Sequence, residues 1–414
     1  MEKKQVREKR SEVLDLSSES NEGKPPAVVL GGSATGLGAV KWLAKDGVKV
    51  YVVDSNPKVT CFYSSQCEKR LSPGTDKVDD AVEYLVSLGR EIGQRAVLFS
   101  TSDGWSLVVA RGHKKLKEYY SYDFISEQEY LRLEDKREQY RIAEKVGVDY
   151  PKTAEIKKGK NEAEEMKNAG EAAAGLRFPV LVKPIDAADF FNKFYSKGFV
   201  SRSAEEAADN YKKAKRAGFE CVLQEIIEGP ETELYSFVSY IDSKGELKRS
   251  FMAHKIRQYP PHFGTCTLGE SVYVPEIIEP SLRLLNEFNF SGPSQVEYKR
   301  GKDGKYYLME INPRIWLWHS LSGYCGASII NAAYDSLIGK PVEKIEKWRT
   351  GIKWWDMEKD WVSFRMRSAN GEMGFLEWVG SLRGEKEQVW FNSDDPLLLA
   401  RKIGAVVKRR VGLA

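Results

Sequence analysis

The segment YLMEINPRIW, residues 307–316, places two polar side chains in an apolar run of the kind that forms buried strands. Glu310 and Asn312 are two residues apart, so on a strand their side chains point to the same face. A buried carboxylate is costly unless a partner compensates its charge. The pattern therefore predicts one of two arrangements: a strand end that opens onto water, or a cation held between Glu310 and Asn312.

A predicted hairpin brings a second carboxylate to the same place. The stretch VEYKRGKDGKYYLMEIN, residues 296–312, reads as two strands joined by a turn at KDGK, with Glu297 on the strand opposite Glu310. Two carboxylates and an amide oxygen are hard ligands that suit Mg2+, which shares its shell with water and substrate phosphates. The alternative is a solvated hairpin whose acids pair with the nearby bases Lys299, Arg300 and Arg314.

Two further stretches carry residues that suit a nucleotide. Lys183 ends the apolar strand RFPVLVKP (177–184), where its ammonium group either reaches water or binds a phosphate. The stretch CVLQEIIEGPETELYSF (221–237) predicts a strand, a turn and a second strand, and Glu231 follows the turn. Its hinge offers backbone amides and carbonyls at Gln224, Glu225, Ile226 and Ile227.

A glycine loop near the N-terminus permits a different interpretation. GGSATGLG (31–38) follows a strand and opens a helix, as in dinucleotide-binding loops, and Asp54 is a candidate ribose ligand. Its spacing departs from G-x-G-x-x-G. Further along, TSDGW (101–105) ends a third strand, where open α/β sheets bind ligands. Ser102 and Asp103 therefore either contact a substrate amine or simply cap a helix.

The order of these motifs resembles the ATP-grasp superfamily, and it looks most like the carboxylate–amine ligases of the D-aspartate ligase-like branch. The resemblance covers roughly residues 27–340. It rests on Lys136 in EDKREQYRIAEKVGVDYP, then Lys183, QEIIEGPE, KIRQYPPHFG and EINPRIW, with thirteen residues between Glu297 and Glu310.

The resemblance implies a role for each matching position. Lys136 and Lys183 would contact ATP phosphates, residues 224–227 would bind adenine, and Glu231 would hold the ribose. Glu297, Glu310 and Asn312 would hold one or two Mg2+ ions, with Mn2+ as a possible substitute. A further set would neutralise the transferring phosphoryl group or the substrate carboxylate: Arg314, Lys255 and Arg257. The acceptor substrate would face Gly32 and Ser33 of the glycine loop, together with Ser102 and Asp103.

One segment departs from the family pattern. The lid loop after the strand lysine is usually rich in glycine and serine, whose backbone amides cradle phosphate. Here PIDAADFFNKFYSKG (184–198) is bulky and has no glycine before Gly198. We expect Lys193 or Lys197 to take over this contact.

The elements and the resemblance together predict an α/β fold. Strands at 27–32, 48–54 and 96–100 alternate with helices at 36–47, 79–93 and 103–116, which is typical of a doubly wound parallel sheet. We expect a flexible leader at 1–25 and a Rossmann-like preATP-grasp domain at 26–130. A two-subdomain ATP-grasp domain would follow at 131–345, with a lid at about 153–227 and a large subdomain at about 228–345. Residues 346–414 would form an extension whose role the sequence does not indicate.

Composition narrows the functional classes. The 414 residues carry 64 basic and 60 acidic side chains, so the net charge of +4 does not favour nucleic acid. No apolar stretch is long enough for a membrane span, and the charged N-terminus is unlike a secretory signal. Five scattered cysteines suit a reduced, cytoplasmic protein. A homo-oligomer is compatible with these data.

The leading hypothesis is an ATP-dependent ligase that phosphorylates a small carboxylate and couples the acylphosphate to an amine. A second hypothesis is a carboxylase that activates bicarbonate, and a third is an NAD(P)-dependent oxidoreductase built on GGSATGLG. The third gives Lys183, Glu231 and the acid pair no role. A nucleotide-sensing protein with a decayed site is a fourth, against which the intact acid pair argues. The identities of the carboxylate and the amine are not predicted.

Overall fold

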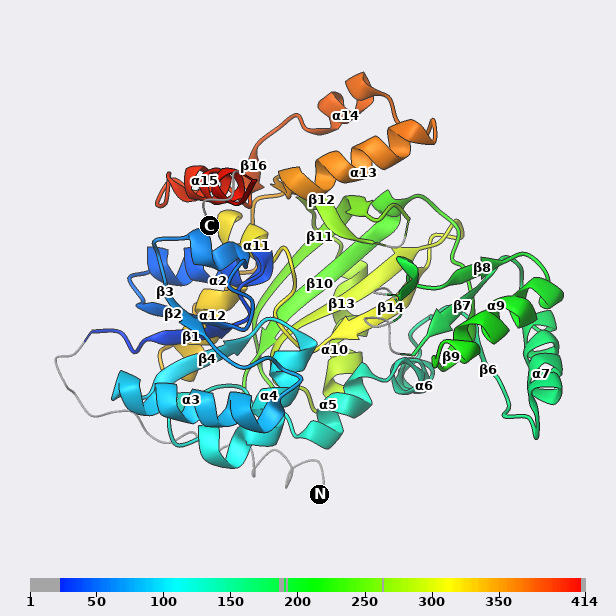
Figure 1. The fold of residues 1–414 in the computed structure, drawn as a ribbon, viewed down its shortest axis with the longest axis horizontal. Coiled ribbons are helices and arrows are strands. Elements are labelled where there is room, and N and C mark those ends of the chain that lie inside the picture. Colours follow the sequence, from blue (N-terminus) through cyan, green and yellow to red (C-terminus); the bar gives the residue numbers. More distant parts are fainter. Residues whose placement is uncertain (1–22, 186–189, 191–192, 263, 411–414) are drawn as a thin grey trace.

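The computed structural model describes residues 23–185, 190, 193–262 and 264–410, except the side chains of 406 and 408–410. Most of the predicted leader, residues 1–22, lies outside this range. In the part of the chain that the structure describes, three sheets organise the fold (Figure 1). The predicted combination of a parallel N-terminal sheet with a two-part second domain is confirmed.

The N-terminal sheet is five-stranded and entirely parallel, with strand order β3-β2-β1-β4-β5. Its middle strands are almost entirely apolar and buried, as expected for a parallel sheet with helices on both faces. The polar edge strand β3 was not predicted. The strands are β1 (Ala27–Leu30), β2 (Val50–Asp54), β3 (Glu68–Leu71), β4 (Ala96–Ser100) and β5 (Tyr120–Ser121), and the helices are α2 (Ala34–Lys45), η1 (Thr60–Tyr63), α3 (Val78–Ile92) and α4 (Asp103–Leu116).

A small antiparallel sheet of order β6-β9-β7-β8 forms the lid, with α7 packed beside α9 (Figure 1). The strands and helices of this sheet run from Thr153 to Glu225. Its elements are β6 (Thr153–Glu155), α7 (Glu162–Ala174), β7 (Val180–Pro184), β8 (Phe199–Ser201), α9 (Ala204–Arg216) and β9 (Cys221–Glu225).

A seven-stranded sheet of order β14-β13-β10-β11-β12-β15-β16 forms the body of the molecule. The strands are β10 (Leu234–Ile241), β11 (Leu247–Tyr259), β12 (Thr265–Ser271), β13 (Gly292–Arg300), β14 (Tyr306–Asn312), β15 (Lys353–Trp355) and β16 (Lys386–Gln388). The last two strands come from residues 346–414. The C-terminal extension is therefore built into the central sheet.

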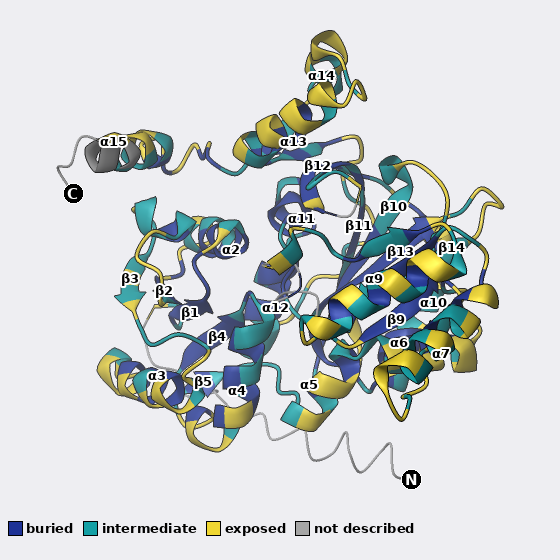
Figure 2. Cartoon of the chain, turned by 45° about the vertical axis from the view of Figure 1, so that its right-hand side comes forward, coloured by how far each residue is buried: buried dark blue, intermediate teal, exposed yellow. Residues whose placement is uncertain are grey.

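Helices join these sheets. Between the first sheet and the lid run α5 (Glu127–Glu134) and α6 (Lys136–Val146), and the large subdomain adds η2 (Glu231–Glu233), η3 (Pro275–Ile277), α10 (Ile278–Glu287), α11 (Ser320–Tyr324) and α12 (Ile329–Leu337). The C-terminal extension adds α13 (Met357–Ala369), α14 (Phe375–Ser381) and α15 (Leu398–Arg410). Helices α13 and α14 project from the body and carry many exposed residues (Figure 2). Among the described residues, no helix has the length and apolar character needed to cross a bilayer.

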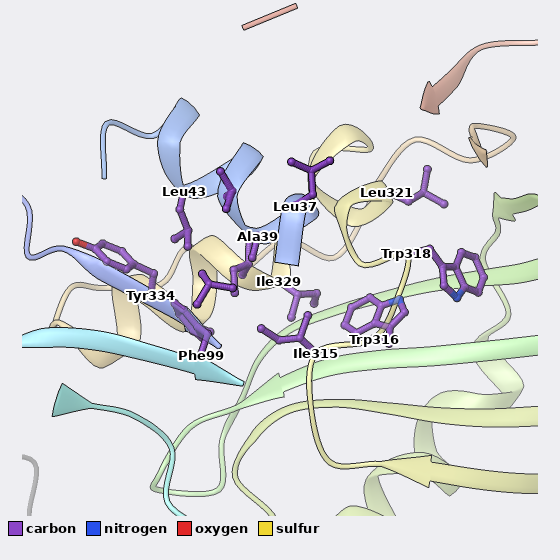
Figure 3. Close-up of a cluster of buried hydrophobic side chains, with 14 of the residues drawn as sticks. Leu37, Ala39, Leu43, Phe99, Ile315, Trp316, Trp318, Leu321, Ile329 and Tyr334 are labelled. Carbon is purple, nitrogen blue, oxygen red and sulfur yellow. The ribbon is translucent and has the colours of Figure 1, made fainter. Parts of the chain in front are cut away.

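One hydrophobic core fastens the N-terminal domain to the large subdomain. Leu37 and Leu43 of α2 lie in it together with Trp316 and Trp318, which follow β14 (Figure 3). Trp354 of β15 belongs to the same core, so the C-terminal extension is packed into it as well. This shared core holds the end of β14 against the N-terminal domain, and it thereby sets the position of Arg314 at the seam.

Candidate active site

The predicted acids do meet on adjoining strands. Glu297 of β13 and Glu310 of β14 are directly paired in the antiparallel register, next to a bulge between Glu297 and Tyr298. The Asn312 Nδ2 donates to Glu310 Oε1 at 3.3 Å and to Gln295 Oε1 at 3.2 Å. Two carboxylates and an amide therefore share one face of the hairpin, as the spacing of these residues implied.

Lysines surround Glu310. Lys136 Nζ lies 3.3 Å from Glu310 Oε2, and Lys255 Nζ lies 2.7 Å from Glu297 Oε2. Burial alone would disfavour ionisation of Glu310, but the nearby ammonium groups hold its pKa well below the usual range; these are Lys136, Lys197, Lys255 and Lys183. The four cations come from α6, the lid and β11, so elements far apart in sequence bring them to Glu310.

Lys136 is held in place by its own helix. Helix α6 packs against β14, where Gln139 accepts from the Ile311 N–H at 3.0 Å and donates to the Ile311 carbonyl at 3.1 Å. The Gln139 amide is buried, and it thus bonds both backbone groups of a strand residue adjacent to Glu310. This contact fixes the start of α6, and Lys136 with it, beside the acids.

The lid contributes two lysines. Lys183 Nζ donates to Gln224 Oε1 at 2.9 Å and to the Tyr140 hydroxyl at 3.2 Å. The Gln224 side chain in turn donates to Thr153 Oγ1 at 3.0 Å. Burial lowers the pKa of Lys197, and the charge of Glu310 opposes this shift. By contrast, Lys193 is exposed and donates to the Ala217 carbonyl at 3.4 Å.

Of the two lysines expected to replace the glycine-rich loop, Lys197 is therefore the one that lies in the cleft. Residues 186–189 and 191–192 of the same loop lie outside the described range.

The hinge after β9 already uses part of its backbone. The Glu225 N–H donates to the Lys152 carbonyl at 2.9 Å, and the Ile226 N–H donates to the Pro179 carbonyl at 3.4 Å. The Glu225 carboxylate accepts from the Arg177 N–H at 2.9 Å. Ile227 follows directly and is partly exposed. These bonds fix the hinge to the lid sheet.

Glu231 has one oxygen engaged and one free. Its Oε1 accepts from the His262 N–H at 2.6 Å and pairs with Arg367 of α13. Its Oε2 is buried without a hydrogen-bond partner among the described residues, which leaves an acceptor for a ligand hydroxyl. Arg367 lies 136 residues away in sequence, and no sequence motif indicated this contact.

Arg257 does not join the lysines, which corrects the expectation from sequence. Its guanidinium is buried and bidentate to Asp360 of α13, at 2.7 and 2.8 Å. Residues two apart on a regular strand share a face, but the register of β11 with β12 shifts between Lys255 and Arg257. This bulge sends Arg257 away from Lys255, and it anchors the C-terminal extension instead.

The seam between domains carries Arg314 and Asp103. The Arg314 guanidinium pairs with Asp103, with Nη2 to Oδ2 at 3.2 Å, and its Nη2 also reaches Asn312 Oδ1 at 3.5 Å. Burial opposes the Arg314 charge, but Asp103 raises the pKa of this guanidinium. Ser102 accepts from the Trp105 N–H at 3.5 Å and so serves as the N-cap of α4.

Neighbouring side chains contact the glycine loop directly. The Gly32 N–H donates to Asp54 Oδ2 at 2.7 Å, and Asp54 Oδ1 accepts from Asn56. A Cβ on Gly32 would lie 2.3 Å from Val59 Cγ2, so side-chain packing accounts for this glycine. Ser33 caps α2. Both oxygens of the Asp54 carboxylate, which would bind the ribose of a dinucleotide, thus already accept hydrogen bonds from the backbone. This argues against the oxidoreductase hypothesis.

The oxygen atoms at the hairpin suit a divalent metal ion whose coordination shell is completed by other ligands. Glu297, Glu310 and the Asn312 amide supply hard oxygen donors, the type that Mg2+ prefers. Within the described residues, no group of three histidine, cysteine, aspartate or glutamate side chains is placed to hold a metal. The remaining positions around an ion would therefore be filled by water and phosphate oxygens.

The three sheets together form a known type of fold. A parallel-sheet N-terminal domain is followed by the two-subdomain ATP-grasp fold, with the lid and the central sheet facing each other across the lysine cluster. Solved structures share this architecture. An N5-carboxyaminoimidazole synthetase from Staphylococcus aureus complexed with ADP superposes with a TM-score of 0.60 at 17% identity, covering 78% of this chain and 80% of that chain.

Two other solved structures show the same fold. A biotin carboxylase from Campylobacter jejuni superposes with a TM-score of 0.62 at 14% identity, covering 81% of this chain and 75% of that chain. An L-amino acid ligase from Bacillus licheniformis superposes with a TM-score of 0.54 at 14% identity, covering 77% of this chain and 75% of that chain.

Among curated proteins, the chain is similar to the D-aspartate ligase of Enterococcus faecium (strain Aus0004), with 24% identity over 266 residues. The match covers 61% of this chain and 62% of that relative's length. No model of a known protein family matches the sequence.

Proposed function

We propose that this chain is an ATP-dependent carboxylate–amine ligase. A substrate carboxylate oxygen attacks the γ-phosphorus of ATP, which gives an acylphosphate and ADP. An amine then attacks the acyl carbon, which forms an amide and releases phosphate. Dividing one difficult displacement into two easier steps requires no nucleophile from the protein.

The convergence of four lysines on the Glu297–Glu310 pair is the observation that carries this proposal. Phosphoryl transfer needs positioning and neutralisation of negative charge more than covalent help from the protein. Lys136 and Lys255 flank the acids, while Lys183 and Lys197 come from the lid. Mg2+, held by Glu297, Glu310 and Asn312, would supply further charge neutralisation at the phosphates.

The nucleotide would lie between the lid and the central sheet. The hinge around Ile227 would contact adenine, and the free Oε2 of Glu231 would accept from a ribose hydroxyl. Lys183, fixed by Gln224 and Tyr140, would then point its ammonium group at the phosphates. Arg314, at the seam, is the remaining cation for a substrate carboxylate.

The relative and one structural neighbour guide the choice of substrate. One is named a D-aspartate ligase and the other an L-amino acid ligase, so an amino acid or a related small acid is the carboxylate that we propose. The five free cysteines fit a cytoplasmic location for this reaction.

Bicarbonate is a second candidate acceptor. The biotin carboxylase domain of Hydrogenobacter thermophilus 2-oxoglutarate carboxylase, whose solved structure contains MgADP and bicarbonate, superposes with a TM-score of 0.62. This likeness concerns the fold, and the lysine cluster would suit either acceptor.

A coupled assay tests the proposal. We would measure ADP and hydroxamate together, with hydroxylamine replacing the amine, across amino acids, dicarboxylates, short peptides and bicarbonate. The expected result is ADP formation that depends on one carboxylate, with a matching hydroxamate. ADP with bicarbonate alone would favour the carboxylase. ADP with an acid but never a hydroxamate would exclude an acylphosphate.

A further inference from the structure

Glu134 is a buried carboxyl that no role described above uses. It ends α5, two residues before Lys136, where the chain passes from the N-terminal domain into the ATP-grasp domain. Its Oε1 is buried and has no hydrogen-bond partner among the described residues. Such an atom costs free energy unless a ligand satisfies it.

The groups facing Glu134 are paired with one another. Lys136 of α6 bonds to Glu310 of β14, while Arg314 bonds to Asp103 at the start of α4. The hydroxyl of Tyr130, also on α5, donates to Asp103 Oδ1 at 3.0 Å. Of the three carboxylates in this group, Glu310 pairs with Lys136, and Asp103 pairs with Arg314 and Tyr130. Glu134 is the carboxyl that is left without such a pair.

The ionisation of Glu134 reflects this imbalance. Burial first, and then the charge of Asp103, raises its pKa to about 8, with Arg314 and Lys136 acting in the opposite direction and Glu310 adding to the rise. An ammonium group placed beside it would favour the carboxylate form, because opposite charges stabilise each other most where water is excluded.

The location fits the second half of the proposed reaction. Glu134 lies close enough to Lys136 and Glu310, where the phosphates would be handled, and to the Arg314–Asp103 pair at the domain seam for all four groups to act on its charge. A cavity of about 60 Å³ adjoins this pair and is lined by Tyr130 and Arg314 among others. An amine arriving through the seam would meet the acyl carbon here.

We propose that Glu134 binds the ammonium group of the attacking amine and accepts its proton, an inference that rests on the proposed ligase function. Glu134 takes one proton from the ammonium group, and the freed lone pair forms the C–N bond to the acyl carbon. The bond between the acyl carbon and the bridging oxygen of the phosphate then breaks. The departing phosphate receives the second nitrogen proton and leaves as HPO4 2−, and Glu134 returns its proton to water.

The test compares two nucleophiles that differ in protonation. Hydroxylamine is mainly unprotonated at neutral pH, so it needs no proton acceptor before attack, whereas ammonium chloride, glycine and L-lysine present ammonium groups. For Glu134→Gln we expect amide formation with these amines to fall about 100-fold or more, the usual scale for a lost general base. Hydroxamate formation by the same variant should stay within about threefold of the wild-type rate.

Three controls make the result specific. Glu138→Gln removes a carboxylate from the next helix that pairs with Arg132 and Arg141, and it should leave both reactions unchanged. Glu134→Asp should recover part of the amide rate. The wild-type rate of amide formation should fall as the pH is lowered from 9 to 7, through the pKa of about 8 for Glu134. Hydroxylamine stays unprotonated over this range, so its reaction should not show that dependence.

The outcomes separate this proposal from the proposed function. Equal losses of both reactions in Glu134→Gln would mean a structural role, and no loss would mean that the carboxyl is not used; either result overturns the proposal. If the wild-type protein makes hydroxamate but couples none of the three amines, the proposal for Glu134 also fails, because the site then accepts no ammonium group. If it makes no hydroxamate with any acid, the ligase function itself fails.

Discussion

At the scale of single residues, the site is organised by the charges around Glu310. Glu310 lies among lysines from α6, β11 and the lid, and its pKa is held well below the usual range. The competing expectation was a solvated hairpin whose acids pair with Lys299, Arg300 and Arg314. Lys299 instead donates to the Gly229 carbonyl, at 2.9 Å, and Arg314 pairs with Asp103. The acids therefore face the cleft and the lysines from other elements.

Glu310→Gln should abolish most ATP turnover. The change keeps the volume but removes a carboxylate that pairs with Lys136 and that we propose as a ligand of Mg2+. We expect the carboxylate-dependent ADP rate to fall at least 100-fold, with unchanged far-UV circular dichroism. Glu279→Gln, on the exposed face of α10, is the matched control. ADP release near the wild-type rate would mean that Glu310 has only a structural role.

His319 should make stability depend on pH. It is buried at the domain seam, its Nε2–H donates to the Thr35 carbonyl at 2.9 Å, and burial lowers its pKa to about 4. The unfolded chain, with an ordinary pKa near 6.5, binds a proton more readily. The stabilisation is therefore complete above pH 6.5 and is lost as the pH falls towards 4.

Urea unfolding at pH 7 and pH 5 checks this dependence. We expect His319 to account for roughly 2 kcal/mol of the difference in unfolding free energy between the two pH values. His319→Gln should remove that share, whereas His262→Gln, which replaces an exposed imidazole, should not. The same pH dependence in wild type and His319→Gln would contradict the assignment.

At the scale of elements, α13 connects the strands β11 and β12 with Glu231, the residue that we propose for the ribose. Asp360 receives Arg257 of β11 and also accepts from Thr267, Trp355 and Trp378, so the helix is firmly anchored. From that anchor, Arg367 extends to Glu231. The extension therefore helps to orient the carboxylate proposed for the ribose.

Glu231→Ala should weaken ATP binding with little effect on kcat. A ribose contact exists in both the ground state and the transition state, so its loss raises KM alone. We expect KM for ATP to rise about tenfold or more, the scale of one hydrogen bond to a charged group. Arg367→Ala should raise KM by a smaller factor because it only orients Glu231. Arg365→Ala, exposed on the same helix, is the control. An unchanged KM for Glu231→Ala would remove this residue from the site.

At the scale of the whole molecule, the C-terminal extension completes the structure. Its β15 pairs with β12, and Trp354 is buried in the core that joins the two domains. Removing residues 346–414 would expose the edge of β12 and leave the buried Arg257 without Asp360. A buried charge without its partner costs about 3–5 kcal/mol.

A chain ending at residue 345 should therefore be insoluble or unfolded. A chain ending at residue 397 keeps β15, β16 and α13, and it should fold with a modestly lower melting temperature because only the contacts of α15 are lost. Expression, circular dichroism and thermal melting of both chains would measure this difference. A stable 1–345 chain that binds ATP would show that the extension is a separate unit.

Local rules allowed much of this architecture to be predicted from sequence. The strand–helix alternation over 27–125 indicated the parallel sheet, because apolar runs bounded by glycine and polar turns encode nearby structure. The turn at KDGK set the register that pairs Glu297 with Glu310. The position of Lys183 at the end of its strand likewise followed from a short segment.

Contacts across long stretches of chain were decided only by the tertiary structure. The bulge in β11 turned Arg257 towards Asp360, and packing of the extension brought Arg367 to Glu231. Glu134 became a candidate only when α5 was seen folded between the lysine cluster and the domain seam. Periodicity and turn chemistry report on neighbours within a few residues, whereas side chains more than 100 residues apart meet only through the packing of whole elements.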